Sequence, residues 1–199
     1  MLSAFFVVAA EDEKINTLIK YNVISKEDEL HSFISRGRCV DIICNAIGVT
    51  DKIKNAAKYG SYKRPNFSDV DLLTKYSGSM FFAAVRHIGL GEGVYKNGIA
   101  PNFYPKRLTT YEEAVAFIMR CIEPYNPDIN KTNQRALELD LVNNKFLEKR
   151  KCNIPLSDLC DLLYHLINQL CYTDMEDWQS KKYVDILEYN IKRNVDVTR

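Results

Sequence analysis

Apolar residues recur at helical spacing in three stretches of the chain. From Ala114, the residues at offsets 0, 1, 3, 4, 7 and 8 are apolar. The same six offsets are apolar from Cys39 in SRGRCVDIICNAIG and from Leu159 in PLSDLCDLLYHLINQL. This spacing puts the apolar side chains on one face of a helix. The sequence therefore predicts three amphipathic helices in the same phase.

Each of these helices follows a recognisable start signal. Thr110 can be the N-cap of the second helix, and Glu113 completes a capping box with it. Ser35 holds the cap position of the first helix. Pro155 stands at the start of the third, where its fixed φ suits a first helical turn. The shared phase and shared start suggest a repeated unit.

A shorter apolar helix precedes each of the three. These helices are predicted in INTLIKYNVIS, FFAAVRHIGLGEG and RALELDLVNNKF, with ends at Asn22, Gly89 and Asp140. Asn, Gly and Asp tolerate the left-handed backbone that ends many helices. Each unit is therefore predicted to run helix, left-handed cap, loop, N-cap and helix.

The glycine-rich run from Gly89 to Thr110 could be a phosphate-binding loop or a loop between two helices. No strand is predicted before it, and no Gly-Lys-Ser/Thr follows, so the phosphate-loop interpretation fails. We expect the glycines to serve turns, Phe103 to enter the core and Pro105 to stiffen the approach to the cap. Ser68 or Asp69 of NFSDV is placed to cap a turn.

The stretch FSDV … IGLGEGVYKNGIAPNFYPKRLTTYEEAVAFIMRCI resembles an S-layer homology repeat, whose usual shape is Phe-Ser-Asp-Val, a helix, a Gly-rich turn, Phe-x-Pro and Thr-Arg-Ala-Glu before a second helix. A shortened first repeat and a divergent third one resemble it less closely. The resemblance covers about residues 4–172, with repeats at about 4–48, 66–122 and 123–172. Residues 173–199 form a tail that is predicted to be one more amphipathic helix, with Trp178, Tyr183, Leu187 and Ile191 on one side.

The resemblance implies an all-α fold of three helix–loop–helix units in a pseudo-threefold arrangement, plus the C-terminal helix. It implies a non-catalytic module on the bacterial cell surface that binds an acidic, often pyruvylated cell-wall polysaccharide in grooves between the repeats. The family uses the Arg of Thr-Arg-Ala-Glu and the Asp of Ser-Asp-Val as ligand contacts. Arg36 and Asp69 match these positions, whereas Tyr111 and Leu156 stand at the arginine position of the second and third repeats, and Val7 at the aspartate position of the first.

Six residues are candidate ligand contacts, and each has a plainer interpretation. Arg36 and Gly37 belong to the first motif, and we expect Arg36 to lie outside the apolar face. Asp69 can equally be a cap only. Lys106 and Arg107 form a small basic spot that could assist binding of an acidic glycan or could simply be solvated. Tyr111 could stack on a sugar or be an ordinary surface tyrosine of a helix.

Composition excludes several classes of function. The chain has 199 residues, a formal net charge of +1 and 27% charged residues, which gives no general attraction to nucleic acid or membranes. No apolar run approaches the ~20 residues of a membrane span. The beginning, MLSAFFVVAAEDE, is interpreted as the first structural element, with a processed signal peptide as the alternative. No cofactor, metal site or catalytic residue is predicted, since His31, His87 and His165 pair with no nucleophile and no Cys/His cluster has zinc spacing.

The six cysteines bear on where the protein works. We expect Cys39, Cys44, Cys121, Cys152, Cys160 and Cys171 to be reduced and mostly buried, with disulfides as the alternative. Reduced thiols and the lost motif arginines favour a second hypothesis, a protein–protein interaction module on a degenerate repeat fold, working in the cytoplasm. An enzyme is a third hypothesis, which no pattern of carboxylates supports.

Overall fold

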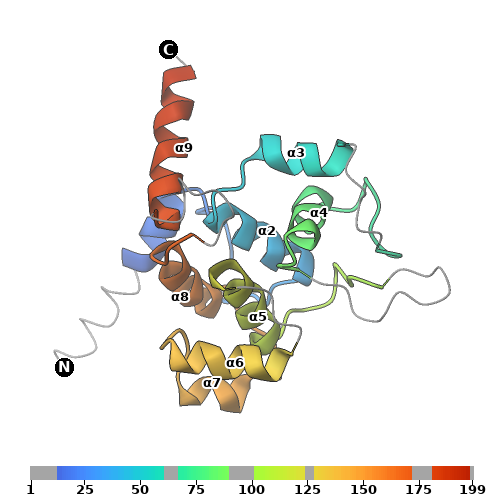
Figure 1. Ribbon diagram of the computed structural model, residues 1–199, viewed down its shortest axis with the longest axis vertical. Helices are drawn as coiled ribbons and strands as arrows, with labels where there is room; N and C mark the ends of the chain where they lie inside the picture. The colour runs from blue at the N-terminus through green and yellow to red at the C-terminus, as the bar shows by residue number, and fades with distance from the viewer. Residues whose placement is uncertain (1–12, 61–66, 90–100, 124–127, 172–180, 198–199) are drawn as a thin grey trace.

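The computed structural model describes residues 13–60, 67–89, 101–123, 128–171 and 181–197, and this part of the chain is all-α (Figure 1). Residues 13–20 are helical. The further helices are α2 (Arg36–Ala46), α3 (Asp51–Tyr59), α4 (Ser77–Val85), α5 (Tyr111–Ile122), α6 (Ile129–Glu138), α7 (Asn144–Lys149), α8 (Leu156–Ile167) and α9 (Tyr183–Val197). The predictions for the first twelve residues, for most of the glycine-rich run and for Trp178 lie outside the described residues.

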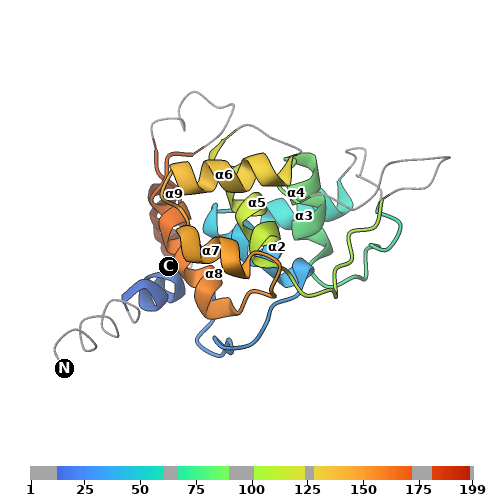
Figure 2. The same ribbon diagram turned by 90° about the horizontal axis from the view of Figure 1, so that it is seen from below.

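The three predicted amphipathic helices are α2, α5 and α8, which contact one another at the centre (Figures 1 and 2). Their predicted starts are confirmed. The Ser35 side chain accepts the N–H of Arg38, and Thr110 with Glu113 forms the complete capping box. Pro155 is the N-cap of α8. Local sequence therefore fixes where each central helix begins.

The preceding helices end in the left-handed backbone that the sequence predicted, but one position differs. Asn22, His87 and Asp140 have φ of 56°, 56° and 52°. In each case the next residue donates its N–H to the carbonyl five residues earlier, as in a Schellman motif: Val23 to Leu18, Ile88 to Ala83 and Leu141 to Ala136, at 2.9, 2.7 and 3.0 Å. The prediction of Gly89 as the left-handed cap was wrong. The Ile88 side chain is buried, and the left-handed residue that turns the chain so that it can be buried is the one before it, His87.

Three segments that lead into α2, α5 and α8 form a closed cycle of backbone hydrogen bonds. We call residues 30–37, 105–112 and 150–157 the lead-in segments. The residue before each N-cap donates to its counterpart in another segment: Thr109 to Ile34 at 2.9 Å, Ile154 to Thr109 at 2.9 Å and Ile34 to Ile154 at 3.4 Å. Every lead-in segment is thereby bonded to both others.

The first two residues of each central helix add six more bonds to this cycle. Their N–H groups have no partner inside their own helix. The first helical residues donate to carbonyl groups as follows: Arg36 to Arg107 at 2.8 Å, Tyr111 to Cys152 at 3.1 Å and Leu156 to Ser32 at 3.1 Å. The second helical residues donate likewise: Gly37 to Pro105 at 3.0 Å, Glu112 to Arg150 at 3.0 Å and Ser157 to Leu30 at 2.7 Å. Each helix start is thus held by carbonyl groups of the neighbouring lead-in segment.

The core lies under this cycle and is continuous across the helices. Ile34, Thr109 and Ile154 of the lead-in segments are at most 6% exposed. Phe103 is fully buried, which confirms its predicted position in the core, and its ring contacts Phe67 with a centroid distance of 5.1 Å. The Phe-x-Pro stretch therefore anchors the loop that leads into α5.

Two helices, α3 and α7, were not predicted as separate elements. Helix α3 lies directly against α4, at the position of Gly78. A Cβ atom at Gly78 would lie 2.6 Å from the backbone oxygen of Lys54. Only glycine allows the two helices to approach this closely.

Helix α9 packs back on the rest of the fold. Tyr183 and Leu187 are buried and Ile191 is partly buried, in agreement with the predicted apolar side. The Tyr183 hydroxyl donates to the Cys121 carbonyl of α5, and Asn190 donates to the Gly48 carbonyl after α2 at 3.1 Å. The C-terminal helix is therefore part of the same packed body (Figure 1).

We predict that Gly78→Ala destabilises the protein. Ala in a helix interior is normally more stable than Gly by about 0.5–1 kcal/mol. Here the clash with the Lys54 backbone should outweigh this gain and give a net loss of about 1–3 kcal/mol in the free energy of unfolding. Chemical denaturation measures it, with Val85→Ala at a half-exposed site of α4 as the control. A stabilised Gly78→Ala would contradict the close approach.

All six cysteines lie in described residues and are unpaired, and all but Cys152 are buried. The prediction of unpaired, mostly buried thiols is therefore confirmed. Burial raises the pKa of the Cys39, Cys44 and Cys160 thiols to about 12. Burial likewise raises the pKa of Cys171 to about 11 and that of Cys121 further. A thiolate is scarce at these positions at neutral pH, so these thiols are unreactive in the folded protein.

We predict that the native protein shows one rapidly reacting thiol and the denatured protein six. Cys152 is the exposed one. Titration with a chromogenic disulfide reagent, without reductant, should give this ratio, and Cys152→Ser should abolish the rapid phase. Several rapid thiols in the native protein would refute the burial of the others.

Candidate binding grooves

Arg36 is an interior residue rather than a surface one. Its exposed fraction is 2%, so the expectation that it lies outside the apolar face was wrong. Its guanidinium carbon lies 5.1 Å from the ring centroid of Phe103 and 5.3 Å from that of Phe117. Nη1 bonds Glu113 Oε1 at 2.5 Å, and Nε donates to the Phe103 carbonyl at 2.9 Å. The cation predicted for an anionic ligand is already bound by a carboxylate of α5.

Glu113 gathers several donors at this point. Its carboxylate accepts Arg36, Arg107 and the backbone N–H of Thr110. Burial alone would raise the pKa of Glu113, but Arg36, the Thr110 N–H and Arg107 together outweigh it and hold this pKa below its ordinary value of 4.5. Glu113 is therefore ionised at neutral pH and links α2 to α5.

Gly37 and Asp69 serve backbone packing. A Cβ at Gly37 would lie 3.2 Å from the Pro105 oxygen, so glycine permits the contact between α2 and the lead-in segment of α5. The Asp69 carboxylate accepts the N–H groups of Phe103 and Tyr104, both at 2.7 Å. It therefore caps a turn 34 residues away in sequence instead of a local one.

The other three candidates differ in exposure. Lys106 and Arg107 are exposed, and Arg107 pairs with Glu113. Tyr111 is 9% exposed, and its hydroxyl donates to the Asp158 carboxylate of α8. Burial and the hydrogen bond to Asp158 raise the pKa of Tyr111 well above its usual value. Tyr111 is thus a contact between α5 and α8 rather than an ordinary surface tyrosine, and it lines a groove.

The first groove lies between α2 and α3 on one side and residues 73–79 on the other, with a volume of about 620 Å³. We call it the Lys54 groove. Asp41 is almost buried in it and accepts Lys54 Nζ at 2.7 Å, Ser79 Oγ at 2.6 Å and Arg38 Nη1 at 3.1 Å. Its negative charge is therefore balanced by two cations.

Two further lysines line the Lys54 groove. Lys58 and Lys75 lie over the rings of Tyr59 and Tyr76, at 5.2 and 4.9 Å, and neither forms an ion pair in the described part of the chain. The groove is lined by three lysines and two aspartates, a formal charge of +1. Lys54 is held by Asp41, so the ammonium groups of Lys58 and Lys75 are the ones that can meet an anion.

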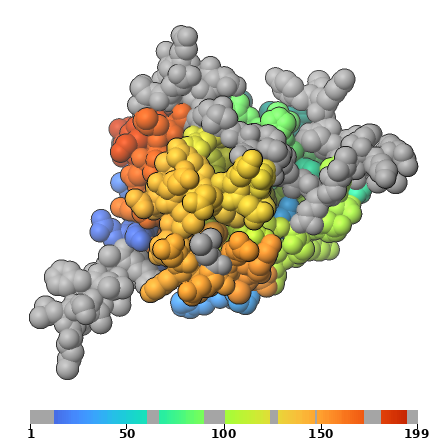
Figure 3. All heavy atoms as spheres, turned by 60° about the horizontal axis from the view of Figure 1, so that its bottom comes forward, coloured from blue at the N-terminus to red at the C-terminus, as the bar shows by residue number. Residues whose placement is uncertain are grey.

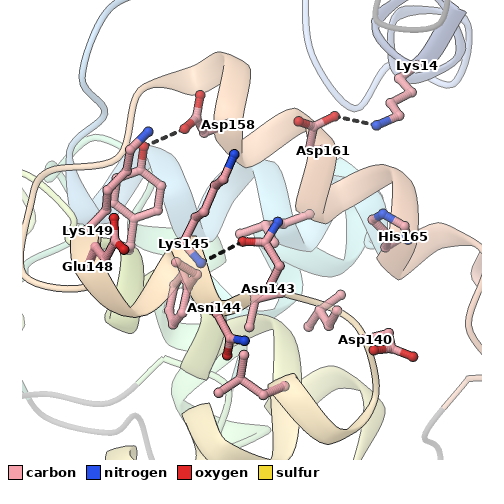
Figure 4. A pocket seen from close by; sticks show the side chains of 16 residues that line it. Lys14, Asp140, Asn143, Asn144, Lys145, Glu148, Lys149, Asp158, Asp161 and His165 are labelled. Carbon is pink, nitrogen blue, oxygen red and sulfur yellow. Dashed lines mark hydrogen bonds and ion pairs between the residues drawn. The ribbon is translucent and has the colours of Figure 1, made fainter. Parts of the chain in front are cut away.

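The second groove lies along α7 and has a volume of about 750 Å³ (Figure 4). We call it the α7 groove. Its walls come from α7, from α8 and from the turn between α6 and α7, with Tyr111 and Lys14 contributed by other helices. Figure 3 shows this side of the molecule, where the yellow and orange surface of α6 to α8 borders blue surface from the N-terminal region. Lys14 pairs with Asp161 at 2.6 Å across the groove rim.

Sequence reasoning missed both sets of lining lysines. Lys54 and Lys58 lie four residues apart on α3, in DKIKNAAKYG, where the spacing of Ile53, Ala56 and Ala57 was the available signal for a helix. Their proximity to Lys75 depends on the packing of α3 against α4, which no local pattern records.

No protein-family model and no curated protein matches the chain. Across the described ranges, no three or more His, Cys, Asp or Glu side chains are grouped so that they could hold a metal ion. No helix in the part of the chain that the structure describes is both long and apolar enough to cross a membrane.

We predict that Glu113→Gln lowers the free energy of unfolding at neutral pH by roughly 3 kcal/mol, because Arg36 would stay buried without its carboxylate. The folded-state pKa of Glu113 is depressed, so its contribution is present above about pH 4.5 and is lost as pH falls through the lower folded pKa. The difference between wild type and variant should therefore shrink in acid. Denaturation across pH measures it.

The matched control is Glu138→Gln on α6, where the carboxylate is half-exposed and pairs with Arg135. This change should cost less than about 1 kcal/mol. Equal losses for the two variants would show that the Arg36–Glu113 pair has no special role.

Proposed function

We propose that the chain is a non-catalytic anchoring module of the bacterial cell envelope, with three units similar to S-layer homology repeats at about 4–48, 66–122 and 123–172. The observation that supports this most is the closed cycle of nine backbone hydrogen bonds. The nine bonds fall into three groups of three. Within each group, the donors stand at one offset from their own N-caps and the acceptors stand at one offset from theirs. A pseudo-threefold arrangement of three equivalent units accounts for this regularity.

We propose that the ligand is an acidic, pyruvylated type of cell-wall polysaccharide and that it binds in the Lys54 groove. The proposed anion contacts are Lys58 and Lys75, since Arg36 is buried and paired with Glu113. The groove lies between α2 of the first unit and the segment leading into α4 of the second, which is the kind of location that the resemblance implies. Asn55 adds an exposed amide that can bond sugar hydroxyls.

A protein–protein interaction module is the second candidate. Phe33 is 57% exposed and Leu108 is 38% exposed, two positions before the N-caps of α2 and α5. Both belong to the lead-in segments, so they lie on one end of the hydrogen-bonded cycle. Such exposed apolar side chains suit contact with another protein. This candidate would stand if no acidic glycan binds.

We predict that Lys58→Gln and Lys75→Gln together weaken binding of an acidic cell-wall polysaccharide about three- to tenfold, because each removes an exposed ammonium partner of the ligand carboxylates. Binding should also weaken as salt is added. Calorimetry with a pyruvylated polysaccharide and with its depyruvylated form measures both effects.

Lys192→Gln on α9 is the control, since it removes the same charge from an exposed site outside both grooves. It should bind like wild type. Equal binding of the depyruvylated polymer would argue against anion recognition. No binding by the wild type at millimolar ligand would favour the protein–protein candidate.

A further inference from the structure

The lead-in segments turn alternate residues towards the core and towards the surface. Ile34, Thr109 and Ile154 are buried, whereas the residues on either side of each are at least partly exposed. Successive side chains of a bridged strand point to opposite sides. The three segments therefore share one outer face, which we call the cycle face. It consists of Phe33, Ser35, Leu108, Thr110, Asn153 and Pro155.

One part of the cycle face is apolar. Phe33 lies opposite Pro155 in one antiparallel bridge, and Leu108 lies opposite Ser35 in another. Because Phe33 and Ser35 are two residues apart on the same side of their segment, Phe33 and Leu108 are diagonal neighbours. Both side chains are exposed. They therefore offer a small apolar contact surface beside Pro155.

Phe33 and Leu108 also offer unpaired backbone groups. The hydrogen bonds of each bridge come from the residues on either side of them. The N–H and C=O of Phe33 and of Leu108 bond no other described residue. In a paired strand, the N–H and C=O of one residue point to the same side. Each of the two residues thus presents a donor and an acceptor together, the pattern by which a strand edge takes up another extended chain.

Positive charge is concentrated in the lead-in segments. They contain five cationic side chains and one carboxylate, Glu112, although the whole chain has a net charge of only +1. Glu112 is buried and accepts Lys151 Nζ at 2.7 Å. The segments thus expose cations and no carboxylate of their own. The exposed cations are Lys106, Arg107, Arg150 and Lys151.

Two of these cations, Lys106 and Arg150, form no ion pair with any described residue. The carboxylates that adjoin the segments in sequence are engaged elsewhere. Asp28 binds Arg38 through both oxygens, and Glu29 accepts the Ser32 hydroxyl at 2.7 Å. Glu113 is shared by Arg36 and Arg107, and Glu148 and Asp158 line the α7 groove. Lys106 and Arg150 are therefore available to a carboxylate from outside.

The backbone groups indicate which kind of anionic partner fits. Phosphate groups of a membrane surface or of a nucleic acid are hydrogen-bond acceptors only, so they would leave the carbonyl groups of Phe33 and Leu108 facing other acceptors. An extended polypeptide supplies a donor and an acceptor at the same spacing. Exposed apolar side chains next to such a strand edge further favour a protein partner.

We propose that the cycle face binds an extended, acidic segment of another protein. The backbone of that segment pairs with Phe33 or Leu108, one of its apolar side chains packs on these two residues, and its carboxylates meet Lys106 and Arg150. The proposal goes beyond the anchoring function, since it needs no polysaccharide. It also gives the second candidate function a defined site and a class of partner.

The probe is a library of random dodecapeptides displayed on phage. The wild-type protein is the bait, and peptides that bind the triple variant Phe33→Ser, Lys106→Gln, Arg150→Gln are removed first. The selection should enrich peptides in which Asp or Glu flank apolar residues. The most enriched acidic peptide is then synthesised for calorimetry.

Separate variants divide the binding of this peptide into its parts, with melting curves to check each fold. Phe33→Ser should weaken binding about tenfold or more, because it removes a buried apolar contact of the complex. Lys106→Gln combined with Arg150→Gln should weaken binding about three- to tenfold. The matched control is Tyr189→Ser, since Tyr189 of α9 is an aromatic side chain with the same exposed fraction as Phe33, 57%. It should bind like wild type.

Amide hydrogen exchange tests the backbone pairing, which charge attraction alone would not produce. In the free protein, the unpaired N–H groups of Phe33 and Leu108 should exchange faster than the bonded ones of Ile34 and Thr109. With the peptide at roughly ten times its Kd, exchange at Phe33 or Leu108 should slow about tenfold.

Enrichment of no acidic peptide, equal binding of the selected peptide by the triple variant, or unchanged exchange at both amides would overturn the proposal. So would binding of phosphatidylglycerol vesicles or of a thymidine oligonucleotide that depends on Phe33, Lys106 and Arg150 while no peptide binds. Lys58→Gln combined with Lys75→Gln should bind the peptide like wild type. A failure of polysaccharide binding in the Lys54 groove is thereby distinguishable from a failure of the cycle face.

Discussion

The central helices depend on hydrogen bonds that none of them can supply alone. The first N–H groups of a helix have no acceptor within it, and a side-chain cap satisfies only one or two of them. Here the N–H groups of the first two residues of α2, α5 and α8 donate to carbonyl groups of a neighbouring lead-in segment. Removing one segment would leave buried donors and acceptors unpaired at both of its neighbours, which costs far more than a single exposed bond.

The same arrangement brings together side chains that stand at equivalent positions after the N-caps. The residue after each N-cap meets the residue three positions after the next N-cap: Arg36 meets Glu113, and Tyr111 meets Asp158. Tyrosine and arginine are both donors, so each satisfies the facing carboxylate. At the third place Leu156 is buried, and Arg38 instead binds Asp28 through both carboxylate oxygens. At two of the three helix starts, a donor after the N-cap thus faces a carboxylate of the next central helix.

The features predicted from sequence are those that neighbouring residues determine. The phase of α2, α5 and α8, the caps at Ser35 and Thr110, and the core position of Phe103 depend on local periodicity and capping. The left-handed cap was misplaced at Gly89 because glycine is a strong local signal. The buried Ile88 fixed the turn at His87, and burial is a property of the whole fold.

The candidate site was predicted less well, for a physical reason. Arg36 was expected at the surface, but its partner Glu113 is 77 residues away, and no spacing reveals such a pair. The lysines of the Lys54 groove come from α3 and from the segment before α4, which meet only because Gly78 lets the helices approach. Groove charge is thus a tertiary property, whereas motif matching examines one segment at a time.

Helix α9 has a consequence for how the chain acquires its structure during synthesis. The ribosome delivers the lead-in segment of α2 long before Ile154 and Leu156, and the acceptors at Gly48 and Cys121 long before Asn190 and Tyr183. The earlier segments therefore keep open backbone groups until α8 and α9 have been synthesised. Folding of this body cannot be completed before α9 has left the ribosome, and the nascent chain exposes apolar helix faces until then.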